Sequence, residues 1–382
     1  MKQIYLDNGA TSFPKAPGVG QAMKDYIEKV GVNVNRSSYR ATAEAALSTL
    51  NVREDLCTLF GGGSDPSYAI FTSGVTMSLN MIMKGVLRTG DHLIISGMEH
   101  NAVARPAMQL EAAGVSVSIA PCDETGVLRL TEFEKLFTPQ TRLVVIQYAS
   151  NVSGTIQPIA EIGAICHRHG ALFTVDSAQA AGHFLFNMQA LQVDAMCFTG
   201  HKGLLGPSGI GGFVMNEAMN KALTPLIAGG TGSMSASLEM PPTLPDRYEA
   251  GTPNLPGIMG LGVALRYLME VGPDALHKRE MALTNRFLDG LHGNSHIRVP
   301  GPVDAKGRVG VISVDFLRQD NAEVAFQLEE QYGILTRCGL HCAPLAHKTL
   351  GTYPEGTVRF SVGYTTTEDE VDTAIQAIHS LS

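Results

Sequence analysis

The segment "TRCGLHCAPLAHKTLGT", residues 336–352, concentrates side chains that bind metals, undergo oxidation or act as nucleophiles. Cys338 and Cys342 stand four residues apart, and His341 directly precedes the second cysteine. A thiolate beside a histidine suits nucleophilic catalysis, because the imidazole can take up or return the thiol proton. These residues alone leave three interpretations open: a metal site, a redox pair and a nucleophile on a loop.

The metal interpretation would use Cys338, His341, Cys342 and His347 as ligands. Their types suit zinc, but the spacing is cramped and no second Cys/His pair follows, so we expect no metal here. A disulfide between Cys338 and Cys342 would be a redox switch. Two buried, inert thiols would be the simplest alternative, and it is disfavoured by the polar His341 and the glycine in the loop.

Length and composition are those of an ordinary globular protein. The 382 residues suffice for two domains, since a single core rarely exceeds about 250–300 residues. The net charge of −8 argues against nucleic acid or an anionic membrane as the main partner. We also expect no membrane span and no secretory signal, since "MKQIYLDNGATS" has no apolar region. Six scattered cysteines fit a reducing compartment, so we expect a cytoplasmic protein.

Short apolar runs rich in β-branched or aromatic residues recur along the first half of the chain and predict buried strands. They occupy residues 68–74, 91–97, 115–121, 142–150, 171–178, 194–200 and 209–215. Amphipathic stretches between several of them, such as 77–87 and 159–170, suit crossover helices. This alternation predicts an α/β fold with a doubly wound, mostly parallel sheet.

From about residue 255 the pattern changes to long helical stretches, followed by mixed strands and helices. This change predicts a smaller α+β C-terminal domain. We expect residues 15–254 to form the large domain. Residues 1–14 and 255–382 would form the small domain, which carries the cysteine segment.

Neither G-x-G-x-x-G nor a P-loop motif follows any predicted strand, so dinucleotide and nucleoside-triphosphate binding lose their main support. Ligands are still expected at the carboxyl ends of the parallel strands. After strand 68–74, the residues Ser73-Gly74-Val75-Thr76 begin a helix. Free N–H groups and hydroxyls there would suit a phosphate, although an ordinary N-capped helix is the simpler alternative.

Three further strand ends carry titratable residues. His100 follows strand 91–97, where a packed structural histidine is the alternative. Asp176 ends a buried strand, with Gln179 one turn later, and needs either a cationic partner or a helix to cap. Lys202 follows an apolar strand in a glycine-rich turn, which would lower its pKa as an imine-forming amine requires; a surface lysine is the alternative.

Together these strand ends supply a phosphate cradle, a ring-stacking histidine, a buried carboxylate and an activated lysine. Pyridoxal 5′-phosphate requires this set: an amine for the imine, a carboxylate for the ring nitrogen and donors for the phosphate. Each signal is weak alone, and the ordered set is specific.

The chain resembles the class V aminotransferase-like, fold-type I pyridoxal-phosphate enzymes, and among them the cysteine desulfurase and selenocysteine lyase group. The resemblance covers almost the whole chain. It is carried by "YLDNGATS", "TSGVT", "EHNA", "ASNVSGT", "VDSAQAAGH", "FTGHKGLLGPSGIG", "YEAGTPN", "RCGLHCAP" and "VRFSVGY".

The resemblance implies that Lys202 holds the cofactor and that His100 stacks on its ring. Asp176 would pair with the pyridinium nitrogen, and Gln179 would contact the ring hydroxyl. The cysteine of "G-x-H-C-A", Cys342, would be the nucleophile.

Other implied roles concern the phosphate and the substrate. The phosphate ligands would be Val75, Thr76, Thr199 and His201, with Thr252 reaching the phosphate of the neighbouring subunit of a homodimer. The substrate-binding residues would be Asn151, Arg359 and Arg36. His341 is a candidate acid/base next to the nucleophile.

The implied activity is conversion of L-cysteine to L-alanine with a persulfide on Cys342. Alternatives are a lyase acting on selenocysteine, cystine or cysteine sulfinate, and, from another class, a metal-binding or thiol-redox protein. The compact cysteine loop resembles the second desulfurase group, with SufS-type and selenocysteine lyase-like enzymes, and this suggests a separate sulfur-acceptor protein. The chain departs from many relatives at Cys338 and Leu340, where they carry Thr and His.

Overall fold

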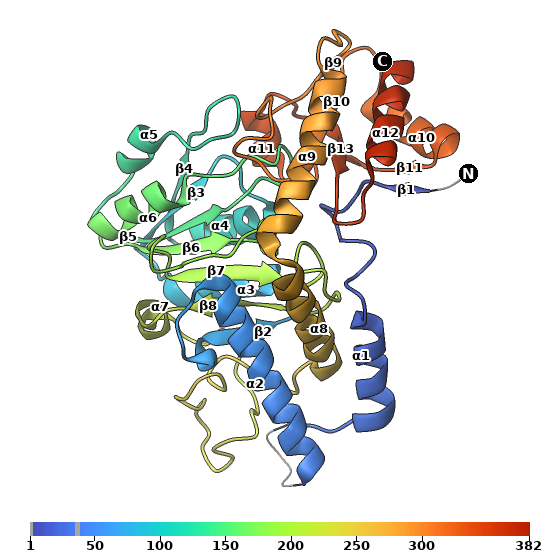
Figure 1. The fold of residues 1–382 in the computed structure, drawn as a ribbon. Coiled ribbons are helices and arrows are strands. Elements are labelled where there is room, and N and C mark those ends of the chain that lie inside the picture. Colours follow the sequence, from blue (N-terminus) through green and yellow to red (C-terminus); the bar gives the residue numbers. More distant parts are fainter. Residues whose placement is uncertain (1–2, 35–38) are drawn as a thin grey trace.

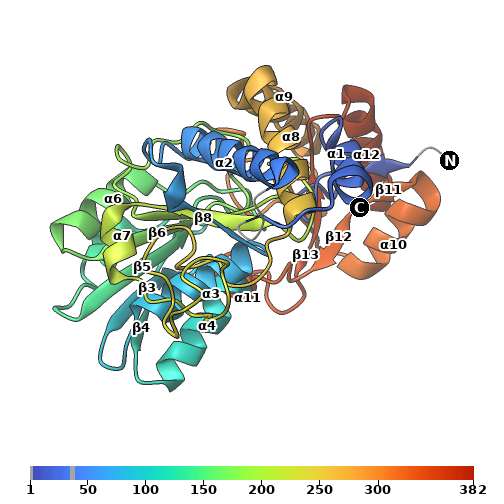
Figure 2. The ribbon, with the colours of Figure 1, turned by 90° about the horizontal axis from the view of Figure 1, so that it is seen from below.

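The computed structural model describes residues 3–34 and 39–382; Arg36 lies outside this range. A seven-stranded sheet runs through the larger part of the molecule (Figures 1 and 2). Its strand order is β2-β8-β7-β6-β5-β3-β4, and β8 alone runs antiparallel to its neighbours. The strands are β2 (Ala69–Thr72), β3 (His92–Ser96), β4 (Ser116–Ala120), β5 (Thr141–Gln147), β6 (Leu172–Asp176), β7 (Ala195–Thr199) and β8 (Gly211–Met215). The predicted mostly parallel α/β sheet is confirmed.

Alternate side chains of each strand pack into two separate hydrophobic cores, one on each face of the sheet, because successive side chains of a strand point to opposite faces. In β5, Val144 and Ile146 belong to one core and Leu143 and Val145 to the other. Helices cover both faces, so every central strand is an apolar run rather than an alternating one.

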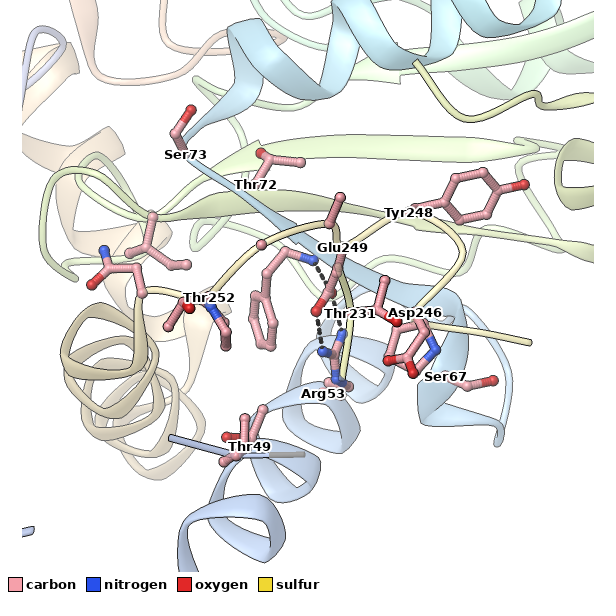
Figure 3. Close-up of a pocket in the computed structure, with 18 of the residues that line it drawn as sticks. Thr49, Arg53, Ser67, Thr72, Ser73, Thr231, Asp246, Tyr248, Glu249 and Thr252 are labelled. Carbon is pink, nitrogen blue, oxygen red and sulfur yellow. Dashed lines mark hydrogen bonds and ion pairs between the residues drawn. The ribbon is translucent and has the colours of Figure 1, made fainter. Parts of the chain in front are cut away.

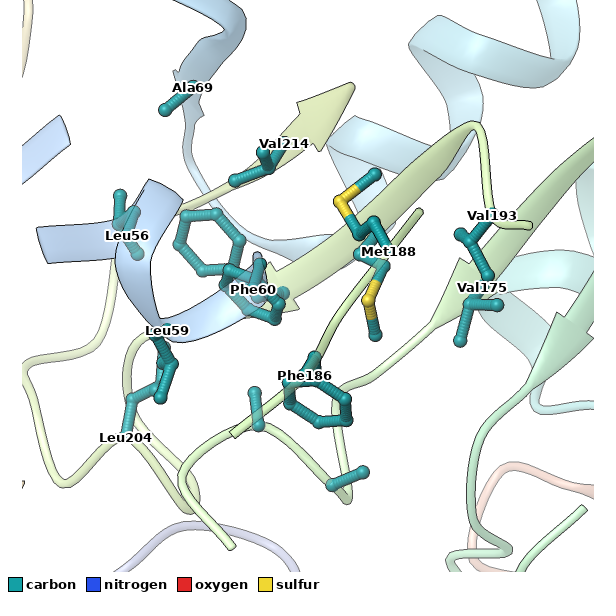
Figure 4. Packing of buried hydrophobic residues seen from close by; sticks show 14 of the residues in the cluster. Leu56, Leu59, Phe60, Ala69, Val175, Phe186, Met188, Val193, Leu204 and Val214 are labelled. Carbon is teal, nitrogen blue, oxygen red and sulfur yellow. The ribbon is translucent and has the colours of Figure 1, made fainter. Parts of the chain in front are cut away.

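The first core lies under α1 (Val19–Asp25), α2 (Arg40–Phe60), α5 (Leu130–Glu134), α6 (Ile159–Arg168) and α8 (Leu255–Val271). Figure 4 shows its centre, where Phe60 of α2 lies beside Phe186 and Val214. The second core lies under α3 (Val75–Val86), α4 (Asn101–Ala112) and α7 (Glu217–Ala222). A five-residue π-helical turn, Tyr26–Val30, follows α1, and a short 3₁₀ helix, Pro66–Tyr68, precedes β2.

The C-terminal part contains an antiparallel sheet of order β12-β13-β10-β9. Its strands are β9 (Ile297–Arg298), β10 (Val311–Phe316), β12 (Arg337–Gly339) and β13 (Thr357–Ser361). The helices around it are α10 (Asn321–Tyr332), α11 (Pro344–Thr349) and α12 (Glu368–Leu381). Near the N-terminus, β1 (Ile4–Tyr5) pairs in parallel with β11 (Ile334–Leu335), so this strand joins the C-terminal part of the molecule.

Helix α9 (Pro273–Leu291) connects the two parts (Figure 1). Its Leu276 packs into the first core of the large sheet, whereas Leu283 and Phe287 pack into the C-terminal core. The preceding helix α8 packs against α1 and α2. The division at residue 254 stays a prediction.

Among the described residues, no helix combines the length and apolarity needed to cross a membrane.

Candidate active site

The carboxyl edge of the parallel strands collects most of the predicted site residues, because parallel strands all end on the same side of the sheet. Thr72, Ser96, Gln147, Asp176 and Thr199 are the last residues of β2, β3, β5, β6 and β7. The segments that follow these strands carry the remaining predicted residues. Val75 and Thr76 begin helix α3, and the turns and loops carry His100, Asn151, Gln179, His201 and Lys202.

Lys202 lies in the turn after β7, and burial lowers its pKa to about 8. The carboxylate of Asp176 opposes this shift, whereas the charges of Arg359 and Arg337 reinforce it. Cys342 also acts on Lys202 electrostatically. The lysine, the carboxylate and the cysteine are therefore neighbours, although 166 residues separate the first of them in sequence from the last.

Asp176 is buried, and its Oδ1 accepts a hydrogen bond from the backbone N–H of Ala178 at 2.9 Å. Burial raises its pKa, and the Ala178 bond and Lys202 oppose the rise. Gln179, one turn later, donates from Nε2 to the carbonyl of Gly9 at 2.9 Å. Among the described residues no cation is bonded to this carboxylate, which leaves it suited to a positively charged ligand.

His100 precedes α4 as its N-cap, and its Nδ1 accepts a hydrogen bond from the backbone N–H of Ala102 at 3.0 Å. Burial lowers the pKa of His100 to about 4, and the charges of Lys202 and Arg359 contribute. The ring is therefore neutral near pH 7, and because Nδ1 is an acceptor, the proton resides on Nε2.

Helix α3 begins directly after β2, with Gly74 as its N-cap and no side chain capping its first N–H groups. A Cβ on Gly211 would lie 2.6 Å from Gly74 Cα, so β8 approaches this helix start more closely than any side chain would permit. Thr199 is buried against Gly74, and the Nδ1 of half-buried His201 has no partner among the described residues. Uncapped N–H groups, a hydroxyl and a free ring nitrogen form an anion cradle.

The cysteine loop has a strained backbone. His341 and Cys342 have φ values of 48° and 57°, in the left-handed region that such residues seldom adopt. Two hydrogen bonds of 2.7 Å hold the loop: Asn151 Nδ2 donates to the His341 carbonyl, and the Asn101 N–H donates to the Cys342 carbonyl. Cys342 is the exposed member of the six cysteines, all of which lie in the described part of the chain.

His341 is buried on the inner side of this loop, and its Nε2 lies 3.1 Å from Thr357 Oγ1. Thr357 donates its own proton to Ser313 Oγ at 3.0 Å, so His341 Nε2 must be the donor to Thr357. Burial holds the pKa of His341 well below its usual range. This position supports the loop; the acid/base role stays a prediction.

Arg359 on β13 is buried and reaches both the loop and the N-terminal segment. Nη1 donates to the Asn151 carbonyl at 3.0 Å, Nη2 pairs with Asp7 at 2.9 Å, and Nε has no partner among the described residues. An unpartnered N–H on a buried guanidinium suits a carboxylate ligand.

Thr252 lies apart from these residues. It is exposed and lines a cavity of about 750 Å³, together with Ser73 just before α3 and the buried ion pair of Arg53 and Glu249 (Figure 3). The cavity opens next to the anion cradle.

Residues 4–373 match the family described as aminotransferase class-V. A probable cysteine desulfurase of Methanothermobacter thermautotrophicus is 32% identical over 96% of this chain and 92% of its own length. A cysteine desulfurase of Escherichia coli O9:H4 is 35% identical over 99% of this chain and 93% of its own length.

The chain belongs to the class V aminotransferase family. Among solved structures, the apo cysteine desulfurase of Thermococcus onnurineus is similar with a TM-score of 0.92 at 31% identity, covering 99% of this chain and 94% of that one. A cysteine desulfurase from Escherichia coli has a TM-score of 0.88 at 27% identity, with coverage of 99% and 94%. The predicted family and the fold-type I architecture are confirmed.

Class V aminotransferase-family enzymes depend on pyridoxal 5′-phosphate, and this chain has the features that the cofactor needs. The uncapped start of α3 and the unpartnered His201 Nδ1 suit its phosphate. The buried Asp176 without a bonded cation suits a protonated ring nitrogen, and the lowered pKa of Lys202 suits the amine that attaches the cofactor. The individual roles of Val75, Thr76, Thr199, Gln179 and Thr252 stay predictions.

Sequence reasoning missed Arg337 in this class V site. It lies on β12 opposite Arg359, is exposed, and lowers the pKa values of His100, Lys202 and His341. The sequence feature that could have indicated Arg337 is its position in "TRCGLHC", five residues before the candidate nucleophile Cys342.

Cys338 faces away from Arg337. It pairs with Val358 of the C-terminal core, and burial and then the charge of Asp320, at the start of α10, raise its pKa. His347 Nδ1 lies 2.7 Å from Thr352 Oγ1. Within the described ranges, no three His, Cys, Asp or Glu side chains are gathered as a metal site would require.

Proposed function

We propose that this protein is a pyridoxal-phosphate-dependent cysteine desulfurase that converts L-cysteine to L-alanine and leaves a persulfide on Cys342. The observation that carries the proposal is the exposed thiol of Cys342, held on a strained loop beside Lys202 and Arg359. The cofactor, when bound, would withdraw electrons from the amino acid and so weaken its Cα–H and Cβ–S bonds.

The residues of the chain supply binding and proton transfer. The free Nε of Arg359 would bind the substrate carboxylate, and Asn151 ties that arginine to the cysteine loop. Lys202, with a pKa of about 8, is partly neutral near pH 7.5 and can hold or release a proton at Nζ. His100 would act as a neutral ring throughout.

Sulfur transfer then follows from the position of Cys342. Its sulfur forms a bond to the substrate sulfur while the Cβ–S bond breaks, with the electron pair left on Cβ. A proton delivered to Cβ, and the return of the proton that left Cα, complete alanine, and the substrate sulfur remains on Cys342 as a persulfide.

The test is mass spectrometry of the purified holoenzyme after brief exposure to L-cysteine without reductant. We expect a one-sulfur adduct on Cys342 and release of alanine, both lost in Cys342→Ser and retained in Cys338→Ser. No adduct on a cofactor-loaded protein would refute the proposal, and selenocysteine, cystine and cysteine sulfinate would then be assayed as substrates. In Lys202→Ala, the visible absorbance of the bound cofactor should disappear; an unchanged spectrum would place the cofactor on another lysine.

We also propose that the protein is a homodimer in which Thr252 completes the partner's phosphate site. Support comes from the 750 Å³ cavity beside the cradle, whose wall carries the exposed apolar residues Leu47, Leu50 and Ile227. Light scattering should give twice the mass of the chain. Leu50→Glu should yield monomers with weaker cofactor binding, whereas Phe326→Glu, exposed on α10, should not. A monomeric wild type would contradict this proposal.

A further inference from the structure

Glu99 is a fully buried carboxyl group that the proposed reaction does not use. It follows β3 and directly precedes His100. Its Oε1 accepts hydrogen bonds from Ser96 Oγ at 2.6 Å and from the backbone N–H of Gln147 at 3.0 Å. Its Oε2 is buried and has no partner among the described residues.

Glu99 and Asp176 form two neighbouring carboxyl groups under the cofactor site. Gln147, which donates to Glu99, pairs in register with Asp176 across β5 and β6. Asp176 has the positive charge of Lys202 within reach, whereas the groups that favour ionised Glu99 are hydrogen-bond donors rather than cations. A buried carboxylate without a cation is costly, and a second carboxylate nearby adds to the cost.

Burial is the main reason that the pKa of Glu99 is raised to about 8, and the charge of Asp176 adds to the rise. Lys202, which acts on Asp176, also has a pKa of about 8 and changes its charge in this range, whereas Cys122 and His100 do not. Cys122, which follows β4, has a pKa raised to about 12 by burial and Glu99, and the pKa of His100 is about 4. Of the two carboxyl groups, Asp176 has the opposing charge of Lys202, whereas the ionised form of Glu99 is favoured by hydrogen bonds alone.

The turn that Glu99 fastens, residues 96–101, connects three parts of the site. Gln147 Nε2 donates to the Met98 carbonyl at 2.5 Å, and Thr349 Oγ1, in α11, donates to the Gly97 carbonyl at 2.7 Å. His100 caps α4 from this turn, and the N–H of Asn101 holds the Cys342 carbonyl. Displacing the turn would move both the ring histidine and the cysteine loop.

We propose that Glu99 is a positioning residue that acts as a neutral acid: it holds the turn carrying His100 against β5 and leaves Asp176 as the ionised member of the two neighbouring carboxyl groups. The inference rests on the proposed function for the identity of the site, but its test does not require sulfur transfer.

The test compares Glu99→Gln, Glu99→Ala and, as a matched control, Glu111→Gln, an exposed glutamate of α4. Urea unfolding of the holoenzyme is followed from pH 5.5 to 8.5. A carboxyl whose pKa is higher in the folded state destabilises that state as pH rises, by up to about tenfold in the folding constant per pH unit, until its folded pKa is passed. Wild type and Glu111→Gln should show this loss between pH 5.5 and 8. Glu99→Gln should show a clearly smaller loss, namely the part that comes from other groups such as His183.

The second readout is the circular dichroism of the cofactor's visible band, without substrate. Glu99→Gln should keep the wild-type band because the amide can replace the neutral acid, whereas Glu99→Ala should change it because the turn is released. If Glu99→Ala does not fold, the Gln variant alone carries the test.

Two results would overturn the inference. One is a Glu99→Gln variant whose stability to urea depends on pH as in the wild type. If Asp176→Asn removes that pH dependence, the proton resides on Asp176. The other is a Glu99→Gln variant with an altered visible band, which would mean that the ionised carboxylate is needed. A protein that forms no persulfide, yet passes both readouts, would refute the desulfurase proposal and leave this inference intact.

Discussion

At the scale of single residues, the site depends on charges that come from distant parts of the sequence. Lys202 is attracted by Asp176 and repelled by Arg359 and Arg337, and burial is the largest influence on its pKa. None of these influences acts alone, so changing one charge should shift the titration of Lys202 without abolishing the site.

Arg337→Met should raise the pKa of Lys202 above its value of about 8, because a positive charge that disfavours the ammonium form is removed. The lysine must be neutral to attack the cofactor, so the rate at which the apoprotein takes up pyridoxal 5′-phosphate should reach its plateau at a higher pH. We expect a displacement of about 0.5 pH unit, because the charge of Arg337 is exposed and screened by solvent.

Arg142→Met is the matched control for this prediction. Arg142 is exposed on β5 near the strand's first residue, at the end of the sheet away from the site. Equal displacement in both variants would show that net charge, rather than the position of Arg337, sets the titration.

At the scale of elements, the cysteine loop is kept in an unfavourable backbone conformation by contacts on its inner side. Left-handed backbone at two successive non-glycine residues persists only where the surroundings enforce it. Those surroundings are Asn151, Asn101 and the Thr357 hydroxyl that accepts from His341.

Thr357→Val should leave His341 Nε2 as a buried donor without an acceptor, at a cost of about 1–3 kcal/mol in the free energy of unfolding. The loop should then lose its position, and the formation of the sulfur adduct on Cys342 should slow by on the order of tenfold or more. Thr352→Val removes a comparable buried bond, to His347, and serves as the control. Thr352→Val should lower the free energy of unfolding but leave the rate of adduct formation unchanged. If both variants form the adduct equally slowly, the effect comes from lower overall stability and not from the position of the loop.

At the scale of the whole molecule, α9 joins the two cores, and a buried ion pair fixes it near the cofactor lysine. His183 Nδ1 lies 2.9 Å from Glu280 Oε2 on α9. A Cβ on Gly203, the residue after Lys202, would lie 2.9 Å from His183 Nε2, so the histidine packs against the lysine turn.

Glu280→Gln should destabilise the protein by about 3 kcal/mol at pH 6, because it leaves a buried imidazolium without its partner. Burial alone would lower the pKa of His183, but the Glu280 carboxylate outweighs it and raises the pKa. The stabilisation is therefore complete below the unfolded pKa of about 6.5 and is lost as pH rises through the higher folded value.

Urea unfolding at several pH values checks this prediction, with Glu270→Gln, exposed on α8, as the control. The difference between wild type and Glu280→Gln should shrink as pH increases. A difference that stays constant with pH would show that His183 is neutral in the folded protein and would contradict the prediction.

The sequence by itself determined the sheet and the order of the residues along its edge. Buried parallel strands must be short apolar runs, and ligand-binding residues must follow them, so both features are visible as local patterns. For this reason the strands β2 to β8 were predictable, as were the positions of Asp176 at a strand end and of His100 and Lys202 shortly after strands. The family followed from the same ordered motifs.

Only the tertiary structure decided which side chains are neighbours in space and how they shift one another's pKa values. Burial and charge are properties of neighbours in space, so no local pattern shows that Glu99 lies near Asp176 without a cation, or that Arg337 acts on Lys202. Cys338 and Cys342 look equivalent in the sequence, yet β12 directs the first toward α10, and the left-handed turn after it exposes the second. The direction of a side chain on a strand depends on how the strand pairs with its neighbour. Cys338 pairs with Val358 of β13, 20 residues later in the sequence, so no local pattern shows where its side chain points.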